Sequence, residues 1–330
     1  MGLVAIACKA RRQAAERCAS NRTSCRSIDA ISDDQNYAEC YWTSDDGLRL
    51  HFRDYPAGGD APPGSERPPI ICLHGLTRNA RDFGRLAPHL ADMGWRVIVP
   101  EMRGRGRSDY ARESQSYTIG QYVADLGALR EQVGVGRYVA IGTSMGGLMT
   151  MAQAMIDPKP IAACVLNDIG PVVEPAGLEQ IMGYVGQGGS FPTWMHAARA
   201  LEELHGEAHP TYALDDWLAM AKRNMTVCGN GRIAFDYDMK IAEPLRATDG
   251  VNAAVAPDLW PGLTALAQRP MLLIRGAASN LLSEATMREM QRRAPQATVV
   301  TVPGTGHAPT LDEPEARAAL DAFFAQLAAG

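Results

Sequence analysis

The chain has 330 residues, of which 46% are hydrophobic, and its formal net charge is −5 at pH 7. This length allows one α/β domain with an insertion, or two domains, and the apolar content can form a sizeable core. The weakly acidic balance predicts no general attraction to nucleic acid or to an anionic membrane, and no apolar run is long enough to span a bilayer.

The cysteine content bears on the compartment in which the protein works. The chain has seven cysteines, an odd number without the regular spacing of a disulfide framework. Cys72 and Cys164 lie in apolar, strand-like runs and are expected to be buried thiols. Because this usage suits a reducing compartment, we predict a cytoplasmic protein.

The first 36 residues differ from the rest of the chain. Residues 1–7 are apolar, and Lys9, Arg11 and Arg12 follow them. A secretory signal carries its basic residues before the apolar stretch, so the order here is reversed. We predict a flexible N-terminal tail over 1–36.

Strand-like and helix-like patterns alternate after this tail. The expected strands are residues 37–42, 48–55, 69–73, 95–100, 138–141, 161–166, 271–274 and 298–302. The expected helices are residues 81–93, 118–133, 284–293 and 316–327, and one that begins at Met145. The alternation predicts an α/β fold with a doubly wound, mostly parallel sheet of eight strands.

Residues 172–258 interrupt this alternation with helix-like segments rich in Met, Trp and Tyr. They lie between the sixth and seventh expected strands, so the chain must leave the sheet and return to it. We predict a helical cap over 172–258, on a core formed by 37–171 and 259–330. Ligands of such sheets bind at the carboxyl ends of the strands, where a cap can cover them.

Three aromatic residues of the predicted cap are candidates for the lining of a substrate pocket. They are Tyr184, Trp194 and Trp217. The alternative for each of them is that it packs the cap against the core. We expect that at least some members of this set face the pocket.

A sharp turn is predicted between the fifth strand and the following helix. The turn contains G-x-S-x-G, which is Gly142-Thr143-Ser144-Met145-Gly146. Glycines let the backbone bend without side-chain clashes, so Ser144 would project its hydroxyl from the strand end. The N-terminus of the helix directs free N–H groups at the same point.

Four motifs follow one another in an order typical of a known family. They are His74-Gly75, Arg103-Gly104-x-Gly106-x-Ser108, the turn at Ser144, and Gly306-His307. The chain resembles α/β-hydrolase fold enzymes of the capped, esterase-like branch over about residues 37–328. The motifs together are specific for this fold and only weakly specific for a substrate.

The resemblance implies a nucleophile, a base and an oxyanion hole. Ser144 would be the nucleophile, and His307, in a loop before the last helix, would take its proton and return it to the leaving group. The N–H groups of Leu76 and Met145 would stabilise the oxyanion. His74 is expected to brace its loop through a hydrogen bond, and a place in the substrate pocket is the alternative.

The acidic member of the triad departs from the family pattern. Most relatives carry an aspartate after the seventh strand, where this chain has Asn280. An amide can orient His307 but cannot stabilise an imidazolium by charge. Some relatives carry the acid after the sixth strand instead, and Asp168 occupies that position. We predict Asp168 as the acid and keep Asn280 as the alternative.

Other motifs predict no cofactor and no metal. No G-x-G-x-x-G follows the first strand, and the segment from His205 to His209 does not match H-E-x-x-H. The arginines between Arg103 and Ser108 resemble a nucleic-acid-binding patch by charge alone, with binding of a phosphate as the alternative, but in the family this loop is a structural turn beside the site.

These observations predict a serine hydrolase that cleaves a small or medium carboxylic ester or lactone through an acyl-enzyme. One alternative is a carbon–carbon bond hydrolase that acts on a ring-cleavage product. The other is a catalytically weakened receptor of the same fold, which Asn280 favours. The expected partner is a small-molecule substrate, with no nucleic acid and no membrane, and the expected state is a monomer or homodimer.

Overall fold

The computed structural model describes residues 36–58, 67–247 and 258–329. The predicted N-terminal tail, apart from Asn36, lies outside the described residues.

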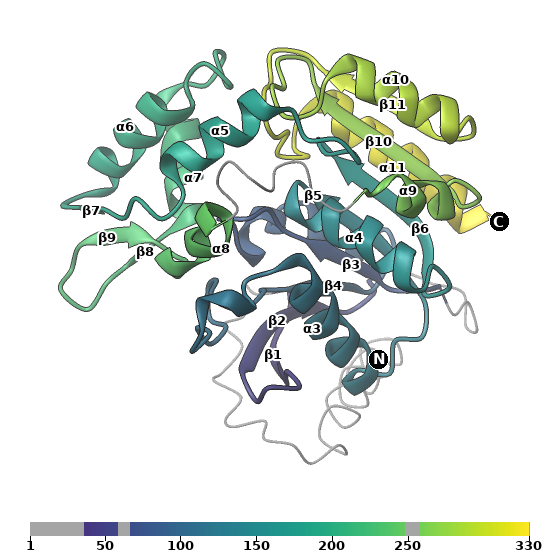
Figure 1. Ribbon diagram of the computed structural model, residues 1–330, viewed down its shortest axis with the longest axis horizontal. Helices are drawn as coiled ribbons and strands as arrows, with labels where there is room; N and C mark the ends of the chain where they lie inside the picture. The colour runs from purple at the N-terminus through teal and green to yellow at the C-terminus, as the bar shows by residue number, and fades with distance from the viewer. Residues whose placement is uncertain (1–35, 59–66, 248–257, 330) are drawn as a thin grey trace, which may run out of the picture.

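The main sheet has eight strands in the order β1-β2-β4-β3-β5-β6-β10-β11 (Figure 1). Their bounds are β1 Ala38–Thr43, β2 Arg49–Tyr55, β3 Ile70–Leu73, β4 Val97–Pro100, β5 Tyr138–Thr143, β6 Ile161–Asn167, β10 Met271–Gly276 and β11 Thr298–Val302. Strand β2 runs antiparallel to β1 and to β4, and every other neighbouring pair is parallel. The prediction of a mostly parallel, eight-stranded sheet is confirmed.

Helices cover the two faces of this sheet. Their bounds are η1 Ala80–Phe83, α2 Leu86–Asp92, η2 Ser114–Ser116, α3 Ile119–Gln132, α4 Met145–Ile156, α9 Trp260–Leu266, α10 Glu284–Arg293 and α11 Pro314–Ala329. Alternate side chains of β5 point to opposite faces, so Ala140 packs with α3 and α4, and Ile141 packs with α2 and α11. The central strands β3, β4, β5, β6 and β10 are therefore buried on both sides, which explains their nearly continuous apolar runs in the sequence.

The helix expected over 81–93 is divided into η1 and α2. Pro88 has no N–H, so a continuous helix through it would lose the hydrogen bond to the carbonyl of Gly84. Pro88 lies in the first turn of α2 instead, where that hydrogen bond is not needed.

The described part of the segment between β6 and α9 forms a separate layer of helices and short strands (Figure 1). Its elements are α5 Pro175–Tyr184, β7 Ser190–Phe191, α6 Trp194–His205, α7 Leu214–Asn224, β8 Met225–Val227, β9 Ile233–Phe235, η3 Met239–Ile241 and α8 Ala242–Ala247. The three strands pair in an antiparallel sheet, which the prediction of a purely helical cap did not include. The missed signal is the hairpin dipeptide Asn230-Gly231, where Gly231 has a φ of +76°.

The cap is tied to the loops that follow β3 and β4. Arg81 of η1 donates to Asp236 at 2.7 Å and to the carbonyl of Arg223 at 2.9 Å. Tyr117 donates to the carboxylate of Asp238 at 2.6 Å. These contacts fix the cap elements relative to the strand ends.

Candidate active site

The strand register brings the ends of three strands to one edge of the sheet. Leu73 of β3 lies beside Gly142 of β5, which lies beside Leu166 of β6. The residues that follow these positions therefore meet at the same edge. They include Ser144 and Asp168.

The turn at Ser144 has the geometry that its glycines predict. Ser144 has a φ of +50° between the end of β5 and the start of α4, a conformation uncommon for a residue with a side chain. A Cβ atom at Gly142 would lie 2.5 Å from the carbonyl carbon of Gly146, and one at Gly146 would lie 2.1 Å from the carbonyl oxygen of Leu73. Glycine is therefore required at these two positions.

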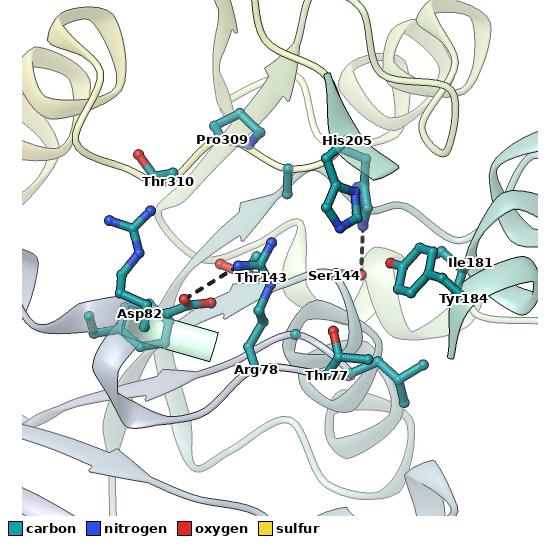
Figure 2. A pocket seen from close by; sticks show the side chains of 16 residues that line it. Thr77, Arg78, Asp82, Thr143, Ser144, Ile181, Tyr184, His205, Pro309 and Thr310 are labelled. Carbon is teal, nitrogen blue, oxygen red and sulfur yellow. Dashed lines mark hydrogen bonds and ion pairs between the residues drawn. The ribbon is translucent and has the colours of Figure 1, made fainter. Parts of the chain in front are cut away.

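Three predicted site residues form one continuous chain of contacts. His307 Nε2 lies 2.9 Å from Ser144 Oγ, the contact drawn as a dashed line at Ser144 in Figure 2. His307 Nδ1 lies 2.8 Å from Asp168 Oδ2. Asp168 is fully buried, and its Oδ1 accepts a hydrogen bond of 2.9 Å from the backbone N–H of Gly276. The carboxylate is thus held on one side by backbone and on the other by imidazole.

The alternative acid position lies elsewhere. Asn280 is exposed, and its Nδ2 donates a hydrogen bond of 2.5 Å to Gln180 Oε1 of α5. Within the described part of the chain, Asn280 makes no hydrogen bond with His307. The structure brings Asp168 to the imidazole and leaves Asn280 between the core and the cap.

The two predicted oxyanion donors lie in segments that approach each other. A Cβ atom at Gly75, next to Leu76, would lie 3.8 Å from the Cβ of Ser144, next to Met145. Neither Leu76 N–H nor Met145 N–H donates to another of the described residues. The Leu76 carbonyl accepts from Arg105 Nε at 3.0 Å, which helps to fix this peptide.

His74 does not line the pocket, so its alternative assignment to the substrate pocket is wrong. It is fully buried, its Nδ1 lies 2.7 Å from the carbonyl oxygen of Gly75, and its Nε2 accepts from the Met102 N–H at 3.1 Å. Burial lowers the pKa of His74 to about 4, so the imidazole is neutral near pH 7. It braces the loops after β3 and β4, as the preferred interpretation expected.

A pocket opens at Ser144 and His307 beneath the cap (Figure 2). Tyr184 lines it, together with Ile181 of the same helix. Trp194 and Trp217 do not line it, and their assignment to the pocket is corrected. Trp217 is 1% exposed and lies in the interior of the cap, against which Trp194 packs.

Several polar residues of the pocket were not predicted. They are Thr77, Arg78, Asp82, His205, Arg223 and Thr310. Burial, and next the charge of Arg78, lower the pKa of His205 to about 3, so this imidazole is neutral near pH 7. A signal for Arg78 was available, because it follows His74 by four residues in the loop at the carboxyl end of β3.

Two of the three arginines in the loop after β4 are structural. Arg103 is fully buried and donates to the buried carboxylate of Asp125 at 2.6 and 2.7 Å. Arg105 is also buried and donates to the hydroxyl of Tyr122 at 2.8 Å. Neither guanidinium is available to a phosphate.

The fold, the turn at Ser144 and the contact chain define a class of protein. Residues 68–314 match the family model described as alpha/beta hydrolase fold. The chain belongs to the α/β-hydrolase fold family.

Individual relatives extend over most of the chain. A crystal structure of an alpha/beta hydrolase from Novosphingobium aromaticivorans is 54% identical, covers 88% of this chain and 99% of its own, and superposes with a TM-score of 0.82. The 3-hydroxybutyrate-oligomer hydrolase of Cupriavidus necator is 34% identical over 83% of this chain and 93% of its own length. The 2-(acetamidomethylene)succinate hydrolase of Mesorhizobium japonicum is 25% identical over 73% of this chain and 81% of its own.

The helices of residues 36–58, 67–247 and 258–329 include none with the length and apolar character needed to cross a membrane.

Proposed function

We propose that the protein is a serine hydrolase that cleaves a small or medium carboxylic ester or lactone through an acyl-enzyme. The observation that carries this proposal is the contact chain from Ser144 Oγ through His307 to Asp168. The family and the names of its relatives support hydrolase activity in general. The more specific claim, that the cleaved bond is an ester bond, is part of our proposal.

The first half of the reaction forms the acyl-enzyme. His307 Nε2 takes the proton of Ser144 as Oγ bonds to the carbonyl carbon of the ester. The N–H groups of Leu76 and Met145 stabilise the oxyanion, and each such donor contributes roughly 10²–10³ in turnover. His307 then gives its proton to the alcohol oxygen as the ester bond breaks.

The second half releases the acid. Water attacks the acyl carbon while His307 Nε2 takes its proton, and Ser144 Oγ leaves and recovers a proton from His307. Asp168 holds Nδ1 throughout and stabilises the imidazolium that forms in each half. Because Asp168 is buried and keeps a backbone donor at Gly276, its carboxylate is oriented before the substrate arrives.

The ester bond is supported by the name of one relative. The Cupriavidus necator protein is named for oligomers of 3-hydroxybutyrate, whose units are joined by ester bonds. A carbon–carbon bond hydrolase would use the same serine and histidine and stays an alternative. The receptor alternative rested on Asn280, and it loses its support because Asp168 is the residue beside His307.

The test is ester turnover together with active-site labelling. We expect the wild type to hydrolyse 4-nitrophenyl butyrate and to be labelled by a fluorophosphonate on the peptide that contains Ser144. Ser144→Ala should lose the label and nearly all turnover, and Thr143→Ala is the matched control that should keep the label. A folded wild type without ester turnover and without label would contradict the proposal.

The compartment and the oligomeric state remain parts of this proposal. Cys72 and Cys164 are buried free thiols, and burial raises the pKa of Cys164 to about 12. Such thiols suit a reducing, cytoplasmic compartment. The proposed partner is a small-molecule ester, bound by a monomer or by one subunit of a homodimer.

A further inference from the structure

Two arginines line the pocket that contains Ser144. Arg78 comes from the loop after β3, and Arg223 comes from the last turn of α7 in the cap. Asp82 is the only carboxylate that lines this pocket in the described part of the chain. Apart from the imidazoles, the lining therefore has one positive charge in excess.

The Arg78 side chain donates one hydrogen bond to the described residues, and its other N–H groups donate none there. Its Nη1 donates to Asn224 Oδ1 at 2.9 Å and forms an ion pair with Asp82 Oδ1 at 3.8 Å, a distance too long for a hydrogen bond. A guanidinium has five N–H donors, and Asn224 is its only hydrogen-bond acceptor among the described residues. Figure 2 shows the Arg78 side chain pointing into the pocket, with Asp82 on one side of it.

Arg223 is fixed by its backbone and not by its side chain. Its carbonyl oxygen accepts from Asn79 at 3.1 Å and from Arg81 at 2.9 Å. Its guanidinium makes no hydrogen bond and no ion pair with any residue that the structure describes. A half-buried arginine without an acidic partner is unusual, because its charge is partly removed from water without compensation.

Asp82, which forms an ion pair with Arg78, offsets only one of the two positive charges. His205 lines the same pocket and is held neutral, and its low pKa results in part from the positive charge of Arg78. A second cavity shares Thr77, Arg78, Tyr184 and His205 with the first. It adds the side chains of Leu201, Phe235 and Tyr237, which suit an apolar group. An anionic group on a ligand would therefore balance the excess positive charge of the pocket.

We propose that Arg78 and Arg223 bind a free carboxylate of the substrate, so that the site takes short esters that carry a carboxylate. This inference rests on the proposed function, because it assigns a substrate class to the same site. Planar guanidinium groups match a carboxylate with paired, charge-assisted hydrogen bonds, which are stronger than those that an uncharged ester or amide accepts. Leu76 and Arg78 both line the pocket that contains Ser144, so the carboxylate would bind in the same pocket as the reacting ester.

The test uses two ligands that differ in charge and hardly in size. They are the linear dimer of 3-hydroxybutyrate and its terminal carboxamide, which compete with 4-nitrophenyl butyrate for the site. We expect the wild type to bind the acid about 10- to 100-fold more tightly than the amide, as is typical of hydrogen bonds to a charged group. The ratio of the two inhibition constants is independent of how much enzyme is folded.

Variants of three pocket residues test which side chains cause the preference for the acid. Arg78→Gln and Arg223→Gln should each reduce the acid-to-amide preference by about tenfold, and Asp82→Asn should increase it a few-fold because a repelling carboxylate is lost. Arg288→Gln, at an arginine 71% exposed on α10, is the matched control and should keep the wild-type ratio.

A wild-type ratio near one, or a ratio that the pocket variants do not change, would overturn the carboxylate site while ester turnover stands. Absence of 4-nitrophenyl butyrate turnover from the wild type would contradict the proposed function itself.

Discussion

The carboxylate of Asp168 lies 2.8 Å from Nδ1 of His307, although 139 residues separate them in the sequence. Asp168 follows β6, and the more usual acid position follows β10. These two strands are parallel neighbours, with Ile274 beside Asn167. A carboxylate at the end of β6 therefore reaches the imidazole from the adjacent strand. The N–H of Gly276, at the end of β10, binds its other oxygen.

Asp168→Asn should lower kcat for an ester by about 10⁴, because the amide cannot stabilise the imidazolium. Asn280→Asp is the matched change at the alternative position, and it should alter kcat by less than about threefold because Asn280 contacts Gln180 and not His307. Steady-state kinetics on 4-nitrophenyl butyrate measure both variants. An increase of orders of magnitude in Asn280→Asp would show that the acid was assigned to the wrong strand.

Gly146→Ala should destabilise the protein by about 3 kcal/mol or more, because the new Cβ would lie 2.1 Å from the backbone oxygen of Leu73. Gly127→Ala is the matched control in α3, where a Cβ meets nothing within 4 Å. That change should stabilise by about 0.5–1 kcal/mol, since alanine loses less backbone entropy in a helix. Urea unfolding measures both. Equal effects of the two changes would contradict the close packing at the turn.

His51 should make stability depend on pH. Burial alone would lower its pKa, but hydrogen bonds to Glu101 and Glu39 outweigh burial and raise it. Contact with His51 helps to lower the pKa of Glu101 to about 2, against the opposing effect of burial. A histidine with a raised pKa stabilises the fold below its unfolded pKa, and this stabilisation is lost as the pH rises through the folded pKa.

The measurement is the difference in free energy of unfolding between wild type and His51→Gln. It should be larger at pH 5.5 than at pH 9, because the ion pairs require the protonated imidazole. In a Glu39→Gln background the same comparison should show a weaker pH dependence, since one of the two carboxylates is gone. A difference that is the same at the two pH values would rule out a charged His51.

The sequence was sufficient for the fold because its signals are local. Buried parallel strands appear as apolar runs, and the bounds of β11 and α10 agree with the expected residues 298–302 and 284–293. Gly142 and Gly146 mark a turn whose chemistry lies within five residues. The family was recognisable for the same reason, since its motifs are short and follow one another in a fixed order.

The cap was less predictable, because amphipathic segments do not reveal which side they bury. Trp217 and Tyr184 are both aromatic residues of the cap segment, yet Trp217 fills the interior of the cap and Tyr184 lines the pocket. The hairpin at Asn230-Gly231 was missed because it lies within a stretch of mostly helical segments.

The sequence by itself determined the fold, the turn at Ser144 and the histidine that follows the last strand, because each depends on neighbours along the chain. Only the tertiary structure decided which acidic position meets His307, and which charged side chains share a pocket with Ser144. Those relationships depend on strand order and on how the cap packs over the strand ends. The contact of Asp168 with His307, and the pocket that Arg78 and Arg223 both line, bring together segments more than 100 residues apart.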